Sequence, residues 1–308
     1  MKFSLHQFTY QDLQPGRIDK FLADQLADVS RSSIQKFIQK GLVLVDGLPI
    51  EKSNTRLESG QVVSIEVPEQ EDHTLLAEDL TLDVIYVDEN SIVINKPAGM
   101  VVHPGAGNES GTVVNALLAQ WPEVSEVGDP ERPGIVHRLD KETSGILLIA
   151  RNQKAYAWYV AQFKRRKTDK TYLTLVDGHP PTPSGRIEAP ILRDPKHRQR
   201  MAVGLQGQGR AAITEYFRIK QFRSHDYLEV HPLTGRTHQI RVHMAYLGCP
   251  VVGDTIYGRK HSSIPLDRFF LHAQSLQISL PGEKQLTTFY ARLPDDLQAV
   301  LDKLDSEH

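Results

Sequence analysis

The stretch from residue 132 to residue 151 constrains the fold of this chain most strongly. A Pro-Gly pair breaks the chain near its start, a dense cluster of polar residues follows, and a glycine leads into the apolar run 146–150. A short apolar run after a chain break and polar residues is typical of a buried β-strand. The pattern therefore predicts a core strand, and it places Asp140 on a rigid support at the approach to that strand.

Asp140 follows two residues after Arg138, which carries the opposite charge. A carboxylate in such a place either forms a structural ion pair or serves as a catalytic group that stays ionised in a dry pocket. The local chemistry leaves both interpretations open.

The composition bounds the class of protein. A chain of 308 residues, 40% of them hydrophobic, normally folds as two domains and can bury a substantial core. Cys249 is the only cysteine, so the sequence has no disulfide framework and no Cys-x-x-Cys pair, which is typical of the reducing cytosol. Residues 1–13 lack the apolar core of a signal peptide, and no apolar run approaches membrane-spanning length. We expect a cytoplasmic protein without a membrane partner.

The net charge of −2 hides a separation of charge along the chain. Residues 68–131 contain 13 acidic residues and one basic residue, whereas residues 132–260 contain 23 Lys and Arg against 10 Asp and Glu. A basic central region favours a polyanionic partner such as nucleic acid. The alternative is a positive half that the acidic half balances internally.

Residues 15–67 are predicted to form a small separate domain. Apolar residues at helical spacing predict a helix over 17–26 and a second helix over 30–41, which a serine hydroxyl can begin and a glycine can end. Strand-like segments follow at 42–45 and 61–67. The expected fold is two helices on a small sheet.

The remaining residues, 81–308, are predicted to form a larger domain after an acidic linker, 68–80. A hairpin signal lies at 84–94, and a short helix is expected at 112–119.

A basic run at 164–170 separates a predicted helix, 153–163, from a predicted strand, 171–176. Phosphate contacts made by this run would lie beside Tyr172. Residues 186–210 are expected to be a long loop, either an insertion that contacts RNA or a mobile surface loop.

A last polar motif precedes a predicted helix that Thr237 would cap and Gly248 would end. The apolar stripe of this helix comprises Ile240, Met244 and Leu247. Arg241 then lies one turn from the cap, away from the stripe. His238 and His243 are five residues apart, a spacing that does not bring two ligands to one ion, so we predict no metal site.

Two motifs resemble those of the RluA-type RNA pseudouridine synthases, which isomerise uridine in RNA. The first is His137-Arg138-Leu139-Asp140 followed by Thr143-Ser144-Gly145, and the second is the segment 231–258. Segments 101–108 and 111–118 are similar to the subgroup represented by large-subunit ribosomal RNA pseudouridine synthase D. The likeness covers nearly the whole chain, from about residue 15 to residue 293.

This resemblance implies an α/β (α+β) fold with a mixed, largely antiparallel central sheet and an RNA cleft across it. It implies that Asp140 is the catalytic carboxylate and that Arg241 pairs with it. Tyr172 would stack on the extruded base and accept the proton released from uracil, although a core tyrosine on a strand remains an alternative. His137 and Arg138 would contact the RNA. No cofactor and no metal are implied, and a monomer is the family's usual state.

Residues 17–47 resemble the S4-like RNA-binding module, which is named after a ribosomal protein. The residues that would contact RNA from one face are Arg17, Lys20, Arg31, Ser32, Lys36 and Lys40. Because residues 15–67 contain seven Lys and Arg against seven Asp and Glu, RNA binding by this module depends on the resemblance. The alternative is a small folded domain with an ordinary charged surface.

The sequence leaves two rival functions open. A nucleoside or glycoside hydrolase would need two carboxylates that flank the bond, and Glu142 is the near neighbour of Asp140. A non-catalytic RNA-binding or ribosome-assembly protein would need only the S4-like module and the basic centre. The expected partner is RNA, either large-subunit ribosomal RNA or a pre-ribosomal particle.

Overall fold

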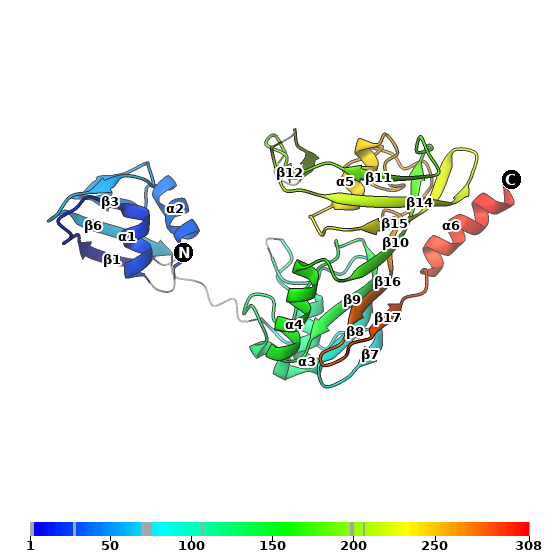
Figure 1. Cartoon of the computed structure of the whole chain (residues 1–308), viewed down its shortest axis with the longest axis horizontal. Coiled ribbons are helices and arrows are strands. Elements are labelled where there is room, and N and C mark those ends of the chain that lie inside the picture. The colour runs from blue at the N-terminus through cyan, green and yellow to red at the C-terminus, as the bar shows by residue number, and fades with distance from the viewer. Residues whose placement is uncertain are drawn as a thin grey trace. The chain divides into compact units, whose positions relative to one another are not determined.

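The computed structural model describes residues 3–26, 29–68, 75–105, 107–197, 200–205 and 207–307. It forms two compact units, an N-terminal unit of residues 1–74 and a C-terminal unit of residues 75–308 (Figure 1). Within the described ranges, no helix has both the length and the apolar character needed to cross a membrane.

The N-terminal unit contains β1 (Phe3–Thr9), β2 (Gly16–Arg17), α1 (Ile18–Gln25), α2 (Arg31–Gln39), β3 (Val43–Val45), β4 (Leu48–Pro49), β5 (Arg56–Leu57) and β6 (Val62–Pro68). Both helices pack on a four-stranded sheet of order β1-β6-β3-β4, with Leu22 and Ile34 fully buried (Figure 1). The Ser30 hydroxyl begins α2 because it accepts the backbone N–H of Ser33. The prediction of two helices on a small sheet is confirmed.

This unit includes a strand that precedes residue 15, where the sequence pattern began the domain. β1 pairs antiparallel with β6 along its whole length, from Phe3 opposite Pro68 to Thr9 opposite Val62. Its side chains alternate between exposed and half-buried, since the strand lies at the edge of the sheet. An edge strand with such modest burial carries too weak an apolar pattern to be predicted alone.

The C-terminal unit is built on a sheet of β7 (Val84–Val87), β8 (Ser91–Lys96), β9 (Ser144–Ala150), β10 (Asp169–Asp177), β11 (Ser184–Glu188), β14 (Ile213–Gln221), β15 (His225–Pro232), β16 (Leu271–Ser279) and β17 (Leu286–Tyr290). Its order is β11-β14-β15-β10-β16-β9-β8-β7, and β17 also pairs with β16. Among the described residues of this sheet, β9 and β16 form the one parallel pairing. The expected mixed, largely antiparallel sheet of an α+β fold is confirmed.

The helices of this unit are α3 (Val113–Gln120), the 3-10 helix η1 (Pro122–Glu126), α4 (Gln153–Lys164), α5 (Gln239–Tyr246) and α6 (Asp295–Ser306). Strand β9 is buried on both faces: Leu147 and Ile149 join the core that contains α3, whereas Ile146 and Leu148 join the core that contains α4. A strand covered on both faces is apolar at every position, which explains the continuous run. The predicted core strand is confirmed.

Part of the predicted linker belongs to the C-terminal unit. Leu75 and Leu80 pack against its apolar core, and the side-chain amide of Asn115 donates to a backbone carbonyl of this segment at 2.7 Å. Residues 75–80 are therefore docked, and residues 69–74 lie outside the described residues.

The prediction of one long loop over 186–210 is wrong. Most of β11 lies in this range and pairs with β14 at the edge of the large sheet, while β12 (Ile191–Arg193) and β13 (Met201–Val203) pair with each other. These strands are short, and single buried residues such as Ile187 alternate with charged neighbours, so the basic composition concealed them. Residues 198, 199 and 206 of the predicted loop lie outside the described residues.

Candidate active site

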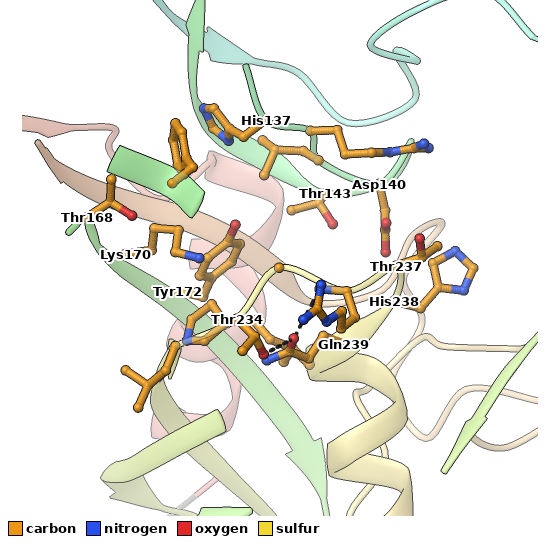
Figure 2. Close-up of a pocket in the computed structure, with 18 of the residues that line it drawn as sticks. His137, Asp140, Thr143, Thr168, Lys170, Tyr172, Thr234, Thr237, His238 and Gln239 are labelled. Carbon is orange, nitrogen blue, oxygen red and sulfur yellow. Dashed lines mark hydrogen bonds between the residues drawn. The ribbon is translucent and has the colours of Figure 1, made fainter. Parts of the chain in front are cut away.

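A cavity of about 500 Å³ lies beside β10, near the middle of the large sheet. Most of its lining comes from three segments that are far apart in the sequence: the residues before β9, the connection from α4 into β10, and the connection from β15 to α5. Arg210 and Leu271 complete the described lining. Figure 2 shows Asp140 from the first segment, Tyr172 from β10 and Thr237 from the third around one space. The lining residues all belong to the C-terminal unit.

Asp140 and Arg241 meet in this cavity although 101 positions separate them in the sequence. Nη1 of Arg241 donates a hydrogen bond to Oδ2 of Asp140 at 3.3 Å. The Asp140 side chain is 18% exposed and that of Arg241 is 4% exposed, so the carboxylate faces the cavity from a pair that is largely shielded. The structure thus brings together the two residues that the sequence paired.

Arg241 is held from behind by Asp254, which the sequence analysis did not single out. Nε and Nη2 of Arg241 donate to the two carboxylate oxygens of Asp254 at 2.6 and 3.0 Å, and the guanidinium lies 4.2 Å from the ring centroid of Phe269. Burial lowers the pKa of Arg241, but the hydrogen bond with Asp254 and the charges of Asp254 and Asp140 outweigh it, so this pKa is raised. Arg241 therefore keeps its charge in the buried site.

The start of α5 differs from the prediction that Thr237 caps it. His238 is the N-cap residue, in a left-handed conformation with φ of 55°, and no side chain caps the helix. The side-chain carbonyl of Gln239 instead fixes the preceding turn, because it accepts the hydroxyl of Thr234 at 2.6 Å and the backbone N–H of Arg236 at 3.1 Å. Thr237 is left on the wall of the cavity (Figure 2).

Tyr172 and Lys170 extend from β10 into the cavity (Figure 2). The ring of Tyr172 packs against apolar core residues, and its hydroxyl has no hydrogen-bond partner within the described ranges. Burial, with a further contribution from the charge of Asp140, raises the pKa of Tyr172, so the phenol is neutral. Burial lowers the pKa of Lys170 to about 8, although Asp169 opposes the shift.

His137 lies in the wall of the cavity as a neutral imidazole. Its Nε2 accepts the backbone N–H of Leu148 at 2.9 Å, and its ring stacks on Phe163 with centroids 4.8 Å apart. Burial and the charge of Lys170 lower the pKa of His137 to about 3. Arg138 is exposed, lines the same cavity and has no ion-pair partner in the part of the chain that the structure describes.

The two other histidines of interest each have hydrogen-bond partners. His238 Nδ1 lies 2.8 Å from the hydroxyl of Tyr257, and the His243 ring lies between the hydroxyl of Thr214 and the carbonyl of Ala189. Among the described residues, no three His, Cys, Asp or Glu side chains gather in a way that could hold a metal ion.

The cavity is strongly basic. Its described lining includes seven Lys and Arg residues and one carboxylate, that of Asp140. Glu142, the near neighbour of Asp140 in the sequence, is not part of this lining. An excess of positive charge in a cavity suits a polyanionic ligand.

In the N-terminal unit, the residues expected to contact RNA are all exposed, namely Arg17, Lys20, Arg31, Ser32, Lys36 and Lys40. The fully buried carboxylate of Asp19 contacts Arg17 and Arg31 at 3.0 Å each. Burial raises the pKa of Asp19, but hydrogen bonds from Arg17, Gln35 and Arg31 outweigh it and lower this pKa. The buried Asp19 therefore holds both arginines in place, while about half of the surface of each arginine side chain remains exposed.

Comparisons with known proteins bear on the family to which the chain belongs. A family model described as RNA pseudouridylate synthase matches residues 90–246, and an S4 domain model matches residues 16–63. The chain is 47% identical to an uncharacterized RNA pseudouridine synthase of Chloroflexus aurantiacus, over 94% of this chain and 90% of that one. It is 37% identical to ribosomal large subunit pseudouridine synthase D of Escherichia coli, over 94% and 91%.

A solved structure of human RNA pseudouridylate synthase domain containing 1 superposes with a TM-score of 0.58 and 27% identity, over 75% of this chain and 96% of that one. The family model matches just over half of the chain, and these relatives are similar along nearly all of it. Both findings assign the chain to the same family. The chain belongs to the RNA pseudouridylate synthase family and is an enzyme that isomerises uridine in RNA.

Proposed function

We propose that this enzyme converts uridines of large-subunit ribosomal RNA to pseudouridine and that Asp140 is its catalytic carboxylate. The contact of Asp140 with the buried Arg241, inside a basic cavity that also holds Tyr172, carries the proposal. The substrate class follows from relatives of Vibrio, Neisseria and Escherichia that are named ribosomal large subunit pseudouridine synthase D.

The reaction begins with cleavage of the bond between N1 of uracil and C1′ of ribose. The electron pair leaves with the uracil, and positive charge builds on the sugar, as in glycoside cleavage. Asp140 meets that charge with a carboxylate, either by bonding to C1′ or by removing a sugar proton. Arg241 keeps the carboxylate in place because it is itself held by Asp254.

The detached uracil then turns, and C5 joins C1′ in place of N1. Tyr172 holds the base by stacking, since its ring is packed and cannot swing away. As a neutral phenol, it accepts the C5 proton only as it passes its hydroxyl proton on, and the carboxylate of Asp140 is the receiving base in our proposal. N1 of the rejoined uracil takes up one proton in turn, so the net transfer is from C5 to N1 and Asp140 ends the cycle ionised. Atoms and electrons are conserved throughout the isomerisation, so the proposal includes no cofactor.

A hydrolase fits the cavity less well. Glycoside hydrolysis usually needs an acid and a base on either side of the bond, and Asp140 is the one carboxylate in the described lining. The described lining therefore lacks the second carboxyl group of the usual pair.

The test uses large-subunit ribosomal RNA transcribed with tritium at C5 of uracil. Isomerisation releases the label as water with the strand intact, hydrolysis yields free uracil, and a pure binder releases nothing. Asp140→Asn should lower release by about 1,000-fold or more with RNA affinity within a few fold. The matched control is Glu142→Gln, a carboxylate two residues away and outside the cavity, which should retain release. Turnover by Asp140→Asn near that of the wild type would remove Asp140 from this role.

We also propose that the exposed cations of the N-terminal unit bind flanking RNA and that the enzyme acts as a monomer. Every lining residue that the structure describes comes from one unit of a single chain, which supports a site complete without a second subunit.

A further inference from the structure

Three arginines that the proposed mechanism does not use line the same cavity. Arg166 follows α4, Arg210 precedes β14, and Arg236 lies between β15 and α5. Arg166 precedes Thr168 and Lys170, two residues of the same segment that Figure 2 labels in the cavity. Three separate parts of the fold thus each contribute one arginine to the lining of a single cavity.

The backbone at each of these positions is held in place. Arg210 exchanges two backbone hydrogen bonds with Ile191, both of 2.9 Å. Nε of Arg236 donates to the carbonyl of Ala211 at 3.0 Å, which links it to the residue after Arg210. Arg166 follows Arg165, the C-cap residue of α4, with φ of 57°, a left-handed conformation in which glycine is the usual residue. An arginine at such a position indicates that its side chain has a use there.

The positive charges of this cluster are not compensated within the protein. None of the three arginines forms an ion pair with a carboxylate in the described ranges, and Asp140 is already bound to Arg241. Burial, and after it the charges of Arg210 and Arg166, lower the pKa of Arg236. The three like charges therefore act on one another at close range, and an anion between them would relieve the repulsion.

We propose that Arg166, Arg210 and Arg236 converge on one phosphate of the RNA backbone, beside the nucleotide that enters the cavity. The planar fork of a guanidinium matches the paired oxygens of a phosphate, and a guanidinium is less strongly hydrated than the ammonium of a lysine. All three arginines line one cavity of about 500 Å³, and the charges of Arg210 and Arg166 both act on Arg236, so a single anion can interact with all three. This inference builds on the proposed RNA substrate and adds the contact that positions it.

Salt dependence of binding tests the number of phosphates. The probe is the large-subunit ribosomal RNA transcript, labelled with a fluorophore, and its dissociation constant is measured with full-length protein over a range of potassium chloride concentrations. Each phosphate contact contributes about 0.7 to 0.9 to the slope of log affinity against log salt. Replacing all three arginines with glutamine should reduce the slope by about one, with affinity lowered about 10-fold or more.

Two outcomes overturn the proposal: an unchanged slope, or a loss of about three, which would mean three separate phosphates. Because a substitution at the left-handed Arg166 can disturb α4, the double variant Arg210→Gln/Arg236→Gln is the second test and should lose the same slope. Arg223→Gln is the matched control, an exposed arginine outside the cavity, and it should keep the wild-type slope.

This experiment is independent of the proposed chemistry because it measures equilibrium binding. If the Asp140→Asn variant were active, the catalytic proposal would be wrong, but the salt dependence of binding would be unaffected. If the salt slope of the arginine variants were unchanged, only the proposed phosphate site would be wrong.

Discussion

Arg241 is bound more closely to Asp254 than to Asp140. It contacts Asp254 through two nitrogens at 2.6 and 3.0 Å and Asp140 through one at 3.3 Å. Asp254 also accepts the backbone N–H groups of Ile256 and Tyr257, so it is fixed to its own turn. Arg241 is therefore an arginine anchored on one carboxylate and presented to another, that of Asp140.

Asp254→Asn should lower the rate of the chemical step about 100-fold with little change in KM, because Arg241 loses the charge that orients it. Single-turnover tritium release at saturating RNA measures this rate. Asp295→Asn, which breaks an exposed ion pair, is the control and should have no effect. A change confined to KM would contradict the positioning role. Asp254→Ala, which leaves the buried Arg241 with only its longer contact to Asp140 among the described residues, should also destabilise the fold by about 3 kcal/mol.

Tyr172→Phe should separate the hydroxyl of this residue from its ring. The phenylalanine keeps the stacking surface, so we expect RNA affinity within a few fold of the wild type but a much slower release of tritium. Tyr172→Leu should weaken binding by a further factor of about 10 because stacking is lost. Binding and single-turnover assays on the same preparations measure both effects, and an active Tyr172→Phe would exclude the hydroxyl from proton transfer.

Lys170 should make RNA binding depend on pH in the alkaline range. Its pKa in the folded protein is about 8, so the ammonium is present below pH 8 and is lost as the pH rises through that value. Since this cation faces the cavity that admits RNA, affinity should fall above about pH 8. Lys170→Arg stays charged and should remove this step from the profile. A wild-type step that survives in Lys170→Arg would assign the titration to another group.

His137 should make the C-terminal unit sensitive to acid. Its pKa is about 3 in the folded protein and near 6.5 in the unfolded protein. Below pH 6.5 the unfolded state therefore binds one more proton, and the free energy of unfolding decreases as the pH is lowered. At pH 5 this linkage is worth ~2 kcal/mol. His137→Asn should show a correspondingly smaller loss between pH 7 and pH 5. Urea unfolding followed by tryptophan fluorescence reports on this unit because Trp121 and Trp158 both lie in it.

Features that a continuous apolar run or a recognisable motif encodes could be predicted from the sequence. The apolar run of β9 predicted a core strand, and the motifs around Asp140 and Arg241 predicted a pair that the fold then assembled. Asp254 was missed because its partnership with Arg241 depends on the turn after α5, which no spacing encodes. β1 and the short strands around Ile187 were missed because their stability comes from partners distant in the sequence.

The parallel pairing of β9 with β16 sets the order in which this enzyme can become active. Ser144 lies opposite His272, so the strand next to the catalytic loop gains its neighbour only after synthesis has passed residue 272. A chain that ends shortly before residue 271 contains both Asp140 and Arg241 but lacks the strand that lies between β9 and β10. We therefore expect RNA modification to require synthesis beyond β16.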